Sequence, residues 1–345
     1  MELFLHIGTE KTGTTSIQHF MAHNRSLLQE QGMLYPRSPG KLNHIGITAL
    51  AQGYGRGELW EKLGITTLTT RDQYASELER SLEAELAVYP FTKVVLSNEH
   101  CSSRLMSDAE VDTLRKFLQR LFSRIRVIIY LRRQDDFVIS TYSTGIKSGR
   151  TDPFEVPRKR RIIGRYDYWD LLNRWSRTFG KENILCRKFE RTNFASGNLI
   201  ADFLTAIGCD PGLAWQNPGS VNSSLDARCL EFLRLMNLHG GVSRPPKLIQ
   251  MLESVSDGPL IDIPEHRRVA FMRELRESNA MVAREYFGGE LTDSDDPLFL
   301  PRSDRRERTH PRELGVEEII ALAATLLSIN APVGRRRNKT TPTDD

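Results

Sequence analysis

Hydrophobic and polar positions follow two different periods over the first 210 residues. Four apolar runs have the length of strands, and they cover residues 2–7, 93–97, 126–131 and 183–188. Between them, apolar residues recur at spacings of three and four, which predicts helices at 14–28, 45–51, 71–89, 107–122, 134–147, 166–179 and 197–207. Because strands alternate with helices, the pattern predicts an α/β fold with a central parallel sheet.

The pattern changes after residue 224, where only helical spacing remains. Helices are predicted at 225–238, 265–287 and 316–327, separated by loops rich in Pro and Asp. We therefore expect one domain over 1–330, with an α/β core over 1–210 and a helical extension over 211–330. The final residues, 331–345, are polar and charged, which predicts a disordered tail.

Composition narrows the class of protein. The chain has 345 residues, of which 39% are hydrophobic, so it can bury a sizeable core. Its net charge of +4 suits anionic ligands without requiring nucleic acid. Four cysteines lie far apart without a C-x-x-C pair, so neither a zinc site nor a disulfide framework is indicated. No run approaches ~18 apolar residues and the chain enters its first strand directly, so we expect a cytoplasmic protein without a membrane span.

The strongest candidate for chemistry is the segment between the first strand and the first helix. A strand, a glycine-bearing turn and a helix aim backbone N–H groups and the positive end of the helix dipole at one point. A lysine adds a charge there, and several hydroxyl groups add hydrogen-bond donors. The sequence therefore predicts a phosphate cradle, formed by Gly8, Lys11, Thr12, Gly13, Thr14, Thr15 and Ser16.

The position of the lysine distinguishes this loop from that of nucleoside triphosphatases. Their pattern, G-x-x-x-x-G-K-[ST], places lysine directly after the second glycine, where this chain has Thr14. Lys11 instead lies two residues before Gly13. This arrangement resembles the 5′-phosphosulfate loop of sulfotransferases, which use 3′-phosphoadenosine-5′-phosphosulfate (PAPS). An unusual nucleoside-triphosphate loop and an ordinary Gly/Thr turn are the alternatives.

A second pattern follows the apolar run 126–131. Arg132, Ser140 and Tyr142 have the spacing R-x₇-S-x-Y, with which sulfotransferases commonly bind the 3′-phosphate of PAPS. The resemblance implies that Arg132 and Ser140 hold this phosphate, and the planar arginine fork suits that task. Arg133 and Gln134 stand where the family often has Asp and Pro, which leaves the role of Arg133 open.

Together the two patterns resemble bacterial PAPS-dependent sulfotransferases, and weaker similarity extends to about residue 290. The resemblance implies a three-layer P-loop-like fold and transfer of the sulfuryl group of PAPS to a hydroxyl or amine, with a carbohydrate as the first candidate acceptor and no metal. Lys11 would stabilise the charge on the leaving phosphate. The acceptor also needs a general base. Glu99, at the end of the run 93–97, is the first candidate, His100 the second and His44 the third.

Two other functions stay open at this stage. The first is an ATP-dependent small-molecule kinase, for which only Asp135 or Asp136 could supply a strand-end magnesium ligand near Arg132. The second is a nucleotide-binding module without catalysis. A basic run at 158–161, with Arg165, is either a solvated loop or a rim that attracts an anionic acceptor. Nucleic acid is a weaker partner because no aromatic residues are interleaved with these charges.

Overall fold

The computed structural model describes residues 1–53, 57–157, 165–217, 219, 224–240, 246–289, 296–301 and 307–330. The chain forms two compact units. The first is made of Met1–Thr141, Glu155–Asn222 and Ile263–Ser303, and the second of Tyr142–Phe154, Ser223–Asp262 and Asp304–Asp345. A single domain over 1–330 with a division at residue 210 stays a prediction. The basic run 158–161 and the tail 331–345 lie outside the described residues.

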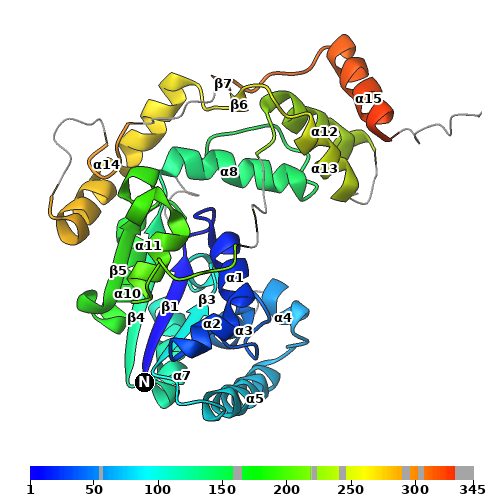
Figure 1. Cartoon of the computed structure of the whole chain (residues 1–345). Coiled ribbons are helices and arrows are strands. Elements are labelled where there is room, and N and C mark those ends of the chain that lie inside the picture. Colours follow the sequence, from blue (N-terminus) through cyan, green and yellow to red (C-terminus); the bar gives the residue numbers. More distant parts are fainter. Residues whose placement is uncertain are drawn as a thin grey trace, which may run out of the picture. The chain divides into compact units, whose positions relative to one another are not determined.

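A five-stranded sheet forms the centre of the first unit (Figure 1). Its strands are β1 (Glu2–Gly8), β2 (Met33–Leu34), β3 (Lys93–Ser97), β4 (Arg124–Leu131) and β5 (Ile184–Lys188), in the order β2-β3-β1-β4-β5. Every neighbouring pair is parallel, which confirms the predicted sheet. Since β1 lies between β3 and β4, the segments that follow these three strands meet at one edge of the sheet.

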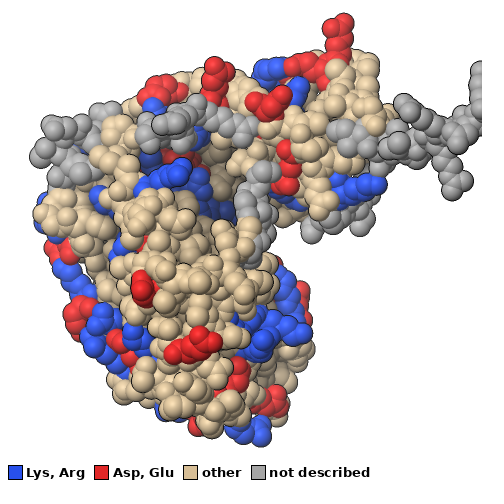
Figure 2. Space-filling model, viewed as in Figure 1, with Lys and Arg blue, Asp and Glu red and all other residues tan. Residues whose placement is uncertain are grey.

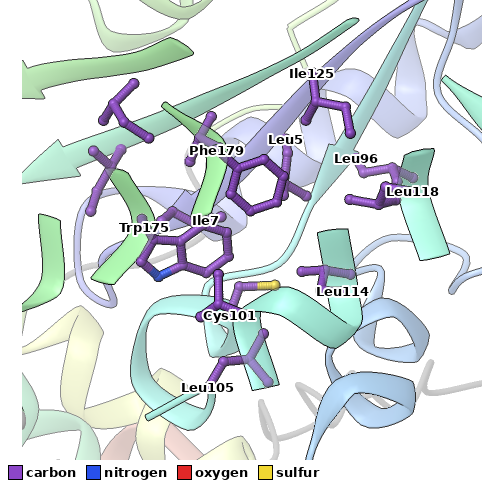
Figure 3. Close-up of a cluster of buried hydrophobic side chains, with 14 of the residues drawn as sticks. Leu5, Ile7, Leu96, Cys101, Leu105, Leu114, Leu118, Ile125, Trp175 and Phe179 are labelled. Carbon is purple, nitrogen blue, oxygen red and sulfur yellow. The ribbon is translucent and has the colours of Figure 1, made fainter. Parts of the chain in front are cut away.

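Helices cover both faces of this sheet. One face packs against α1 (Thr14–His23), α2 (Arg25–Glu30) and α11 (Leu199–Ala206). The other packs against α3 (Ile45–Ala51), α5 (Leu68–Ala87), α7 (Asp108–Leu121) and α10 (Tyr168–Phe179). Figure 3 shows part of this second core, where aliphatic residues of the sheet and α7 meet Trp175 and Phe179. The three-layer α/β architecture is therefore confirmed.

Shorter elements complete the first unit. They are α4 (Glu58–Lys62), α6 (His100–Arg104), three 3₁₀ turns (Lys181–Asn183, Arg191–Asn193 and Ala195–Gly197) and the long α14 (Glu265–Phe287). The helix predicted at 14–28 is instead two helices that meet at Asn24. The Asn24 side chain donates to the carbonyl groups of Phe20 (2.9 Å) and Gln216 (2.8 Å), so it ends α1 locally.

The second unit is mainly helical. It contains α12 (Ala227–His239), α13 (Pro246–Ser254), α15 (Val316–Asn330) and a parallel pair of short strands, β6 (Leu260–Ile261) and β7 (Arg308–Thr309). The helix α8 (Gln134–Lys147) begins in the first unit and ends in the second. In the second unit its last residue, Lys147, forms an ion pair of 2.7 Å with Glu253.

Charged side chains of both signs are present on the face drawn in Figure 2. This mixture agrees with a net charge of only +4 on 345 residues. Within the part of the chain that the structure describes, no helix is both long enough and apolar enough to cross a bilayer.

Candidate active site

The loop that follows β1 is fixed to its neighbours by backbone contacts. The Thr9 backbone N–H and its hydroxyl both donate to the Tyr130 carbonyl on β4, at 3.0 Å each. The Thr12 hydroxyl donates to the Thr9 carbonyl at 2.5 Å, and Thr12 is fully buried, so this hydroxyl serves the loop itself. Gly8 has a φ of +94°, and a Cβ there would lie 3.0 Å from the Cβ of Glu99. The loop and Glu99 are therefore in close contact.

The start of α1 has the properties of an anion site. Gly13 is its N-cap residue, with a φ of +72°, and no side chain caps the helix there. A Cβ at Gly13 would overlap the Leu199 side chain, so the position requires glycine. Thr15 and Ser16 are exposed at the first turn, whereas Thr14 is buried. Uncapped N–H groups therefore lie beside exposed hydroxyl groups, an arrangement that favours an anion.

Lys11 and Arg132, one from each predicted pattern, meet at this loop. The Nη1 of Arg132 donates to the Lys11 carbonyl at 2.8 Å, and its guanidinium lies 5.6 Å from the centre of the Phe189 ring. Lys11 adopts a left-handed backbone conformation with a φ of +65°, which is uncommon outside glycine. Burial lowers the pKa of the Lys11 ammonium, and the neighbouring Glu10 carboxylate acts in the opposite direction. Two cations thus lie beside the uncapped helix.

The remaining residues after β4 have other partners. Arg133 donates through Nε to Asp135 at 3.1 Å and through Nη1 to the Leu300 carbonyl at 3.0 Å, so it braces the start of α8. Asp135, a magnesium ligand in the kinase alternative, is fully buried in this ion pair. Ser140 lies on α8, partly buried, while Tyr142 belongs to the second unit. Among the described residues, no group of three or more His, Cys, Asp or Glu side chains could hold a metal ion.

The Glu10 pocket consists of Glu10, His100, Ser103, Arg104 and Arg165. The Ser103 hydroxyl donates to Oε1 of Glu10 at 2.7 Å, and Nη2 of Arg165 donates to Oε2. The Nδ1 of His100 and Nη1 of Arg104 each lie 3.8 Å from Oε1. Burial alone would raise the pKa of Glu10, but these four partners outweigh it and hold the pKa well below its ordinary value. The carboxylate is therefore surrounded by positive charge.

The Glu99 pocket consists of Glu99, Gln18, Asn43, Ser97 and Asn98. Two side-chain amides donate to Oε2 of Glu99, Gln18 at 2.8 Å and Asn43 at 3.2 Å. The Gln18 amide also donates to the Ser97 hydroxyl at 3.3 Å, and the Asn98 amide donates to Oδ1 of Asn43 at 2.5 Å. Neutral groups therefore hold this second carboxylate.

Two buried histidines support the Glu99 pocket. The Nδ1 of His44 accepts from the Ser97 backbone N–H at 3.0 Å, so its hydrogen is on Nε2, which donates to the Pro36 carbonyl at 3.0 Å. His6 lies 2.8 Å from the Ser97 hydroxyl through Nδ1. Burial lowers the pKa of both histidines to about 3, so both are neutral at physiological pH. Since both ring nitrogens of His44 are occupied inside the protein, this residue cannot act as a base for a bound substrate.

The structure thus brings together the predicted loop, Lys11, Glu99, His100 and Arg132. The sequence reading did not single out the residues that hold the two carboxylates, namely Glu10, Gln18, Asn43, Ser97, Ser103 and Arg104. One signal was present for Gln18, because it lies next to Ile17 and three residues before Met21, on the apolar side of α1. Its burial could have been expected from this position.

Comparison with known proteins gives limited matches. No family model matches the chain. A protein of Archaeoglobus fulgidus, described as an uncharacterized protein, is 30% identical over 194 residues. The match covers 54% of this chain and 53% of that protein, so the chain spans about half the length of this curated relative. The crystal structure of a sulfotransferase from Alicyclobacillus acidocaldarius is similar with a TM-score of 0.39 and 15% identity, covering 70% of this chain and 96% of that one.

Proposed function

We propose that this protein is a sulfotransferase that moves the sulfuryl group of PAPS to an acceptor hydroxyl or amine. One observation carries the proposal: Lys11 lies in an anion-binding loop that contacts Arg132 through a hydrogen bond and Glu99 through Gly8. An anion cradle, a second cation and a carboxylate are the parts that sulfuryl transfer requires. A carbohydrate is the first candidate acceptor, on the strength of the sequence resemblance.

The residues present fit the donor. Bound PAPS would supply an activated sulfuryl group and two further anionic phosphates. The uncapped N–H groups of α1, with Thr15 and Ser16, would bind the 5′-phosphosulfate, and Lys11 would oppose the charge that develops on the leaving phosphate. Arg132 would bind the 3′-phosphate through its guanidinium.

Glu99 would act as the general base. As the acceptor oxygen bonds to sulfur, the hydroxyl proton passes to the Glu99 carboxylate, and the bond between sulfur and the phosphate oxygen breaks. The products are the sulfated acceptor and adenosine 3′,5′-bisphosphate. His100 follows Glu99 directly and is 23% exposed, so it is the second candidate for this role.

Calorimetric titration with adenosine 3′,5′-bisphosphate tests the proposal, with ATP and magnesium titrated in parallel. We expect micromolar binding of the bisphosphate and much weaker binding of ATP. Arg132→Ala should weaken binding of the bisphosphate about tenfold or more, since a charged hydrogen bond contributes about 1.5–3 kcal/mol. Arg124→Ala is the matched control, because Arg124 lies at the opposite end of β4 and is exposed.

Other outcomes would favour the other functions. A preference for ATP with magnesium would overturn the sulfotransferase proposal and favour a kinase. Tight binding of the bisphosphate, with no turnover of PAPS against any acceptor or water, would favour a nucleotide-binding module.

A further inference from the structure

We propose that Gln18 and Asn43 are positioning residues that hold the Glu99 carboxylate in place through Oε2 and leave Oε1 to take the proton from the acceptor. This inference rests on the proposed function, because it concerns the base of that reaction. It starts from the two amide contacts to Oε2, at 2.8 and 3.2 Å.

The direction of the Gln18 amide is set by its surroundings. Gln18 is only 3% exposed, and its Nε2 donates to both Ser97 and Glu99. Ser97 is itself fixed, since its backbone N–H donates to His44 and its hydroxyl contacts His6. The amide nitrogen of Gln18 therefore faces Glu99 and supplies a donor that cannot lose or gain a proton in the physiological range.

The direction of the Asn43 amide is set by a chain of hydrogen bonds. Oδ1 of Asn98 accepts from the Thr48 hydroxyl at 3.0 Å and from the His100 backbone N–H at 2.8 Å. The amide nitrogen of Asn98 is thus turned to Oδ1 of Asn43. Asn43 must then present its own amide nitrogen to Glu99. Asn98 and Thr48 are fully buried, so the part of this chain that orients Asn43 is shielded from water.

The two amides have a specific chemical consequence. Hydrogen bonds to a carboxylate favour its ionised form, and neutral donors do so without cancelling its charge. Protonation at Oε2 would disrupt two hydrogen bonds, whereas protonation at Oε1 leaves them in place. Oε1 is therefore the basic oxygen of Glu99.

Gln18 also links the base to the donor site. It lies on α1, one turn after Thr14, and the start of the same helix forms the predicted phosphate cradle. A contact between Gln18 and Glu99 thus fixes the base relative to the bound donor. Loss of this contact should lower turnover more than it weakens donor binding.

Hydrolysis of PAPS, with water as acceptor, tests the role of these residues without knowledge of the natural acceptor. Sulfate release is measured for Gln18→Met and Asn43→Leu, which keep the approximate shape and remove the donor. We expect kcat to fall about tenfold for each variant, with bisphosphate binding within twofold of the wild type. Gln29→Met, an exposed position on α2, is the matched control.

The split between kcat and donor binding separates positioning from a purely structural role. If both variants lose thermal stability but keep the wild-type kcat, the proposal is overturned.

A spectroscopic measurement tests the contact independently of turnover. The side-chain amide signals of Gln18 and Asn43 in ¹H–¹⁵N spectra should move in Glu99→Gln, because the acceptor of both amides then loses its charge. Signals that are insensitive to Glu99→Gln would overturn the contact. Responsive signals in a protein that neither binds nor hydrolyses PAPS would instead support the contact and overturn the proposed function.

Discussion

The Glu10 pocket and the Glu99 pocket hold their carboxylates in opposite ways, although both carboxylates act on the charge of Lys11. Glu10 lies beside the guanidinium groups of Arg104 and Arg165, which compensate its charge. Among the described residues, the side chains that donate to Glu99 are the neutral amides of Gln18 and Asn43, both at Oε2.

This difference indicates a structural role for one carboxylate and a chemical role for the other. A carboxylate whose pKa is held far below its ordinary value by cations is a poor base, but it anchors the loop firmly. A carboxylate held by amides can still accept a proton. We infer that the Glu10 pocket fixes the loop and that the Glu99 pocket serves the reaction.

The largest expected effect comes from removing the charge of the Glu99 pocket. Glu99→Gln keeps the shape of the side chain but cannot accept a proton, so PAPS turnover should fall about 10²- to 10⁴-fold while bisphosphate binding stays within a few-fold. Sulfate release under steady-state conditions measures the change. Glu30→Gln, an exposed position on α2, is the control. Near-normal turnover in Glu99→Gln would show that Glu99 is not the base, and His100 would become the first candidate for that role.

The second effect is a pH dependence of stability that arises behind the Glu99 pocket. His6 and His44 have a pKa of about 3 in the folded state because they are buried, against 6.5 for an exposed histidine. The unfolded chain therefore binds protons below pH 6.5 that the folded chain does not. The free energy of unfolding therefore has its full value above pH 6.5 and should fall by about 1.4 kcal/mol per histidine for each pH unit below it.

Urea unfolding between pH 7.5 and 4.5 measures this slope. His6→Phe should roughly halve the slope, since the new ring would lie beside Phe203 and Tyr130, which already contact the imidazole. The exposed His239→Gln should leave it unchanged. A flat stability profile in the wild type over this range would show that both histidines are protonated in the folded state.

Local patterns in the sequence predicted much of the fold. The strand at Lys93–Ser97 and the helix at Ile45–Ala51 have the predicted bounds. The two-residue β2 and the five-residue α6 are too short to produce a period that the sequence alone reveals. The order of the strands in the sheet leaves no local pattern in the sequence, because it is set by packing between distant segments.

The candidate site also contains some residues that the sequence could predict and others that it could not. Lys11, Glu99 and Arg132 could be named because each lies in the segment that follows a predicted strand. The Glu10 pocket could not, because its members come from the loop, from α6 and from Arg165, which lie up to 155 residues apart. The position of Gln18 on the apolar side of α1 indicated its burial, but its contact with Glu99 joins segments 81 residues apart and leaves no local pattern in the sequence.

A third prediction concerns the charge of the Glu10 pocket. Glu10→Gln leaves Arg104 and Arg165 without their shared carboxylate, and the repulsion between the two guanidinium groups then remains. The side chains of Arg104 and Arg165 are 35% and 38% exposed, so water screens part of this repulsion. We expect the free energy of unfolding, measured with urea at pH 7, to fall by about 2 kcal/mol. The exposed Glu83→Gln on α5 should change stability little.

The contribution of the Glu10 charge to stability can also be measured by comparing the wild type and Glu10→Gln at different pH values. The folded-state pKa of Glu10 is lowered, so its contribution is complete above about pH 4.5 and is lost as the pH falls further. Between pH 4.5 and 3 the wild type should therefore lose more stability than Glu10→Gln. Equal losses would mean that the cations do not stabilise the carboxylate.

The smallest expected effect compares two serines that are neighbours on α6. The Ser103 hydroxyl donates to the Glu10 carboxylate at 2.7 Å, whereas the Ser102 hydroxyl donates to the Glu99 backbone carbonyl at 2.8 Å. Hydrogen bonds to an ionised acceptor are roughly twice as strong as neutral ones, so Ser103→Ala should cost about 1.5 kcal/mol and Ser102→Ala about 0.7 kcal/mol in urea unfolding. In a Glu10→Gln background the cost of Ser103→Ala should fall to that of Ser102→Ala, because both hydroxyl groups then face neutral acceptors. If Ser103→Ala costs the same stability in that background, the charge of Glu10 contributes nothing to its hydrogen bond with Ser103. The two pockets would then differ in shape and not in how charge stabilises them.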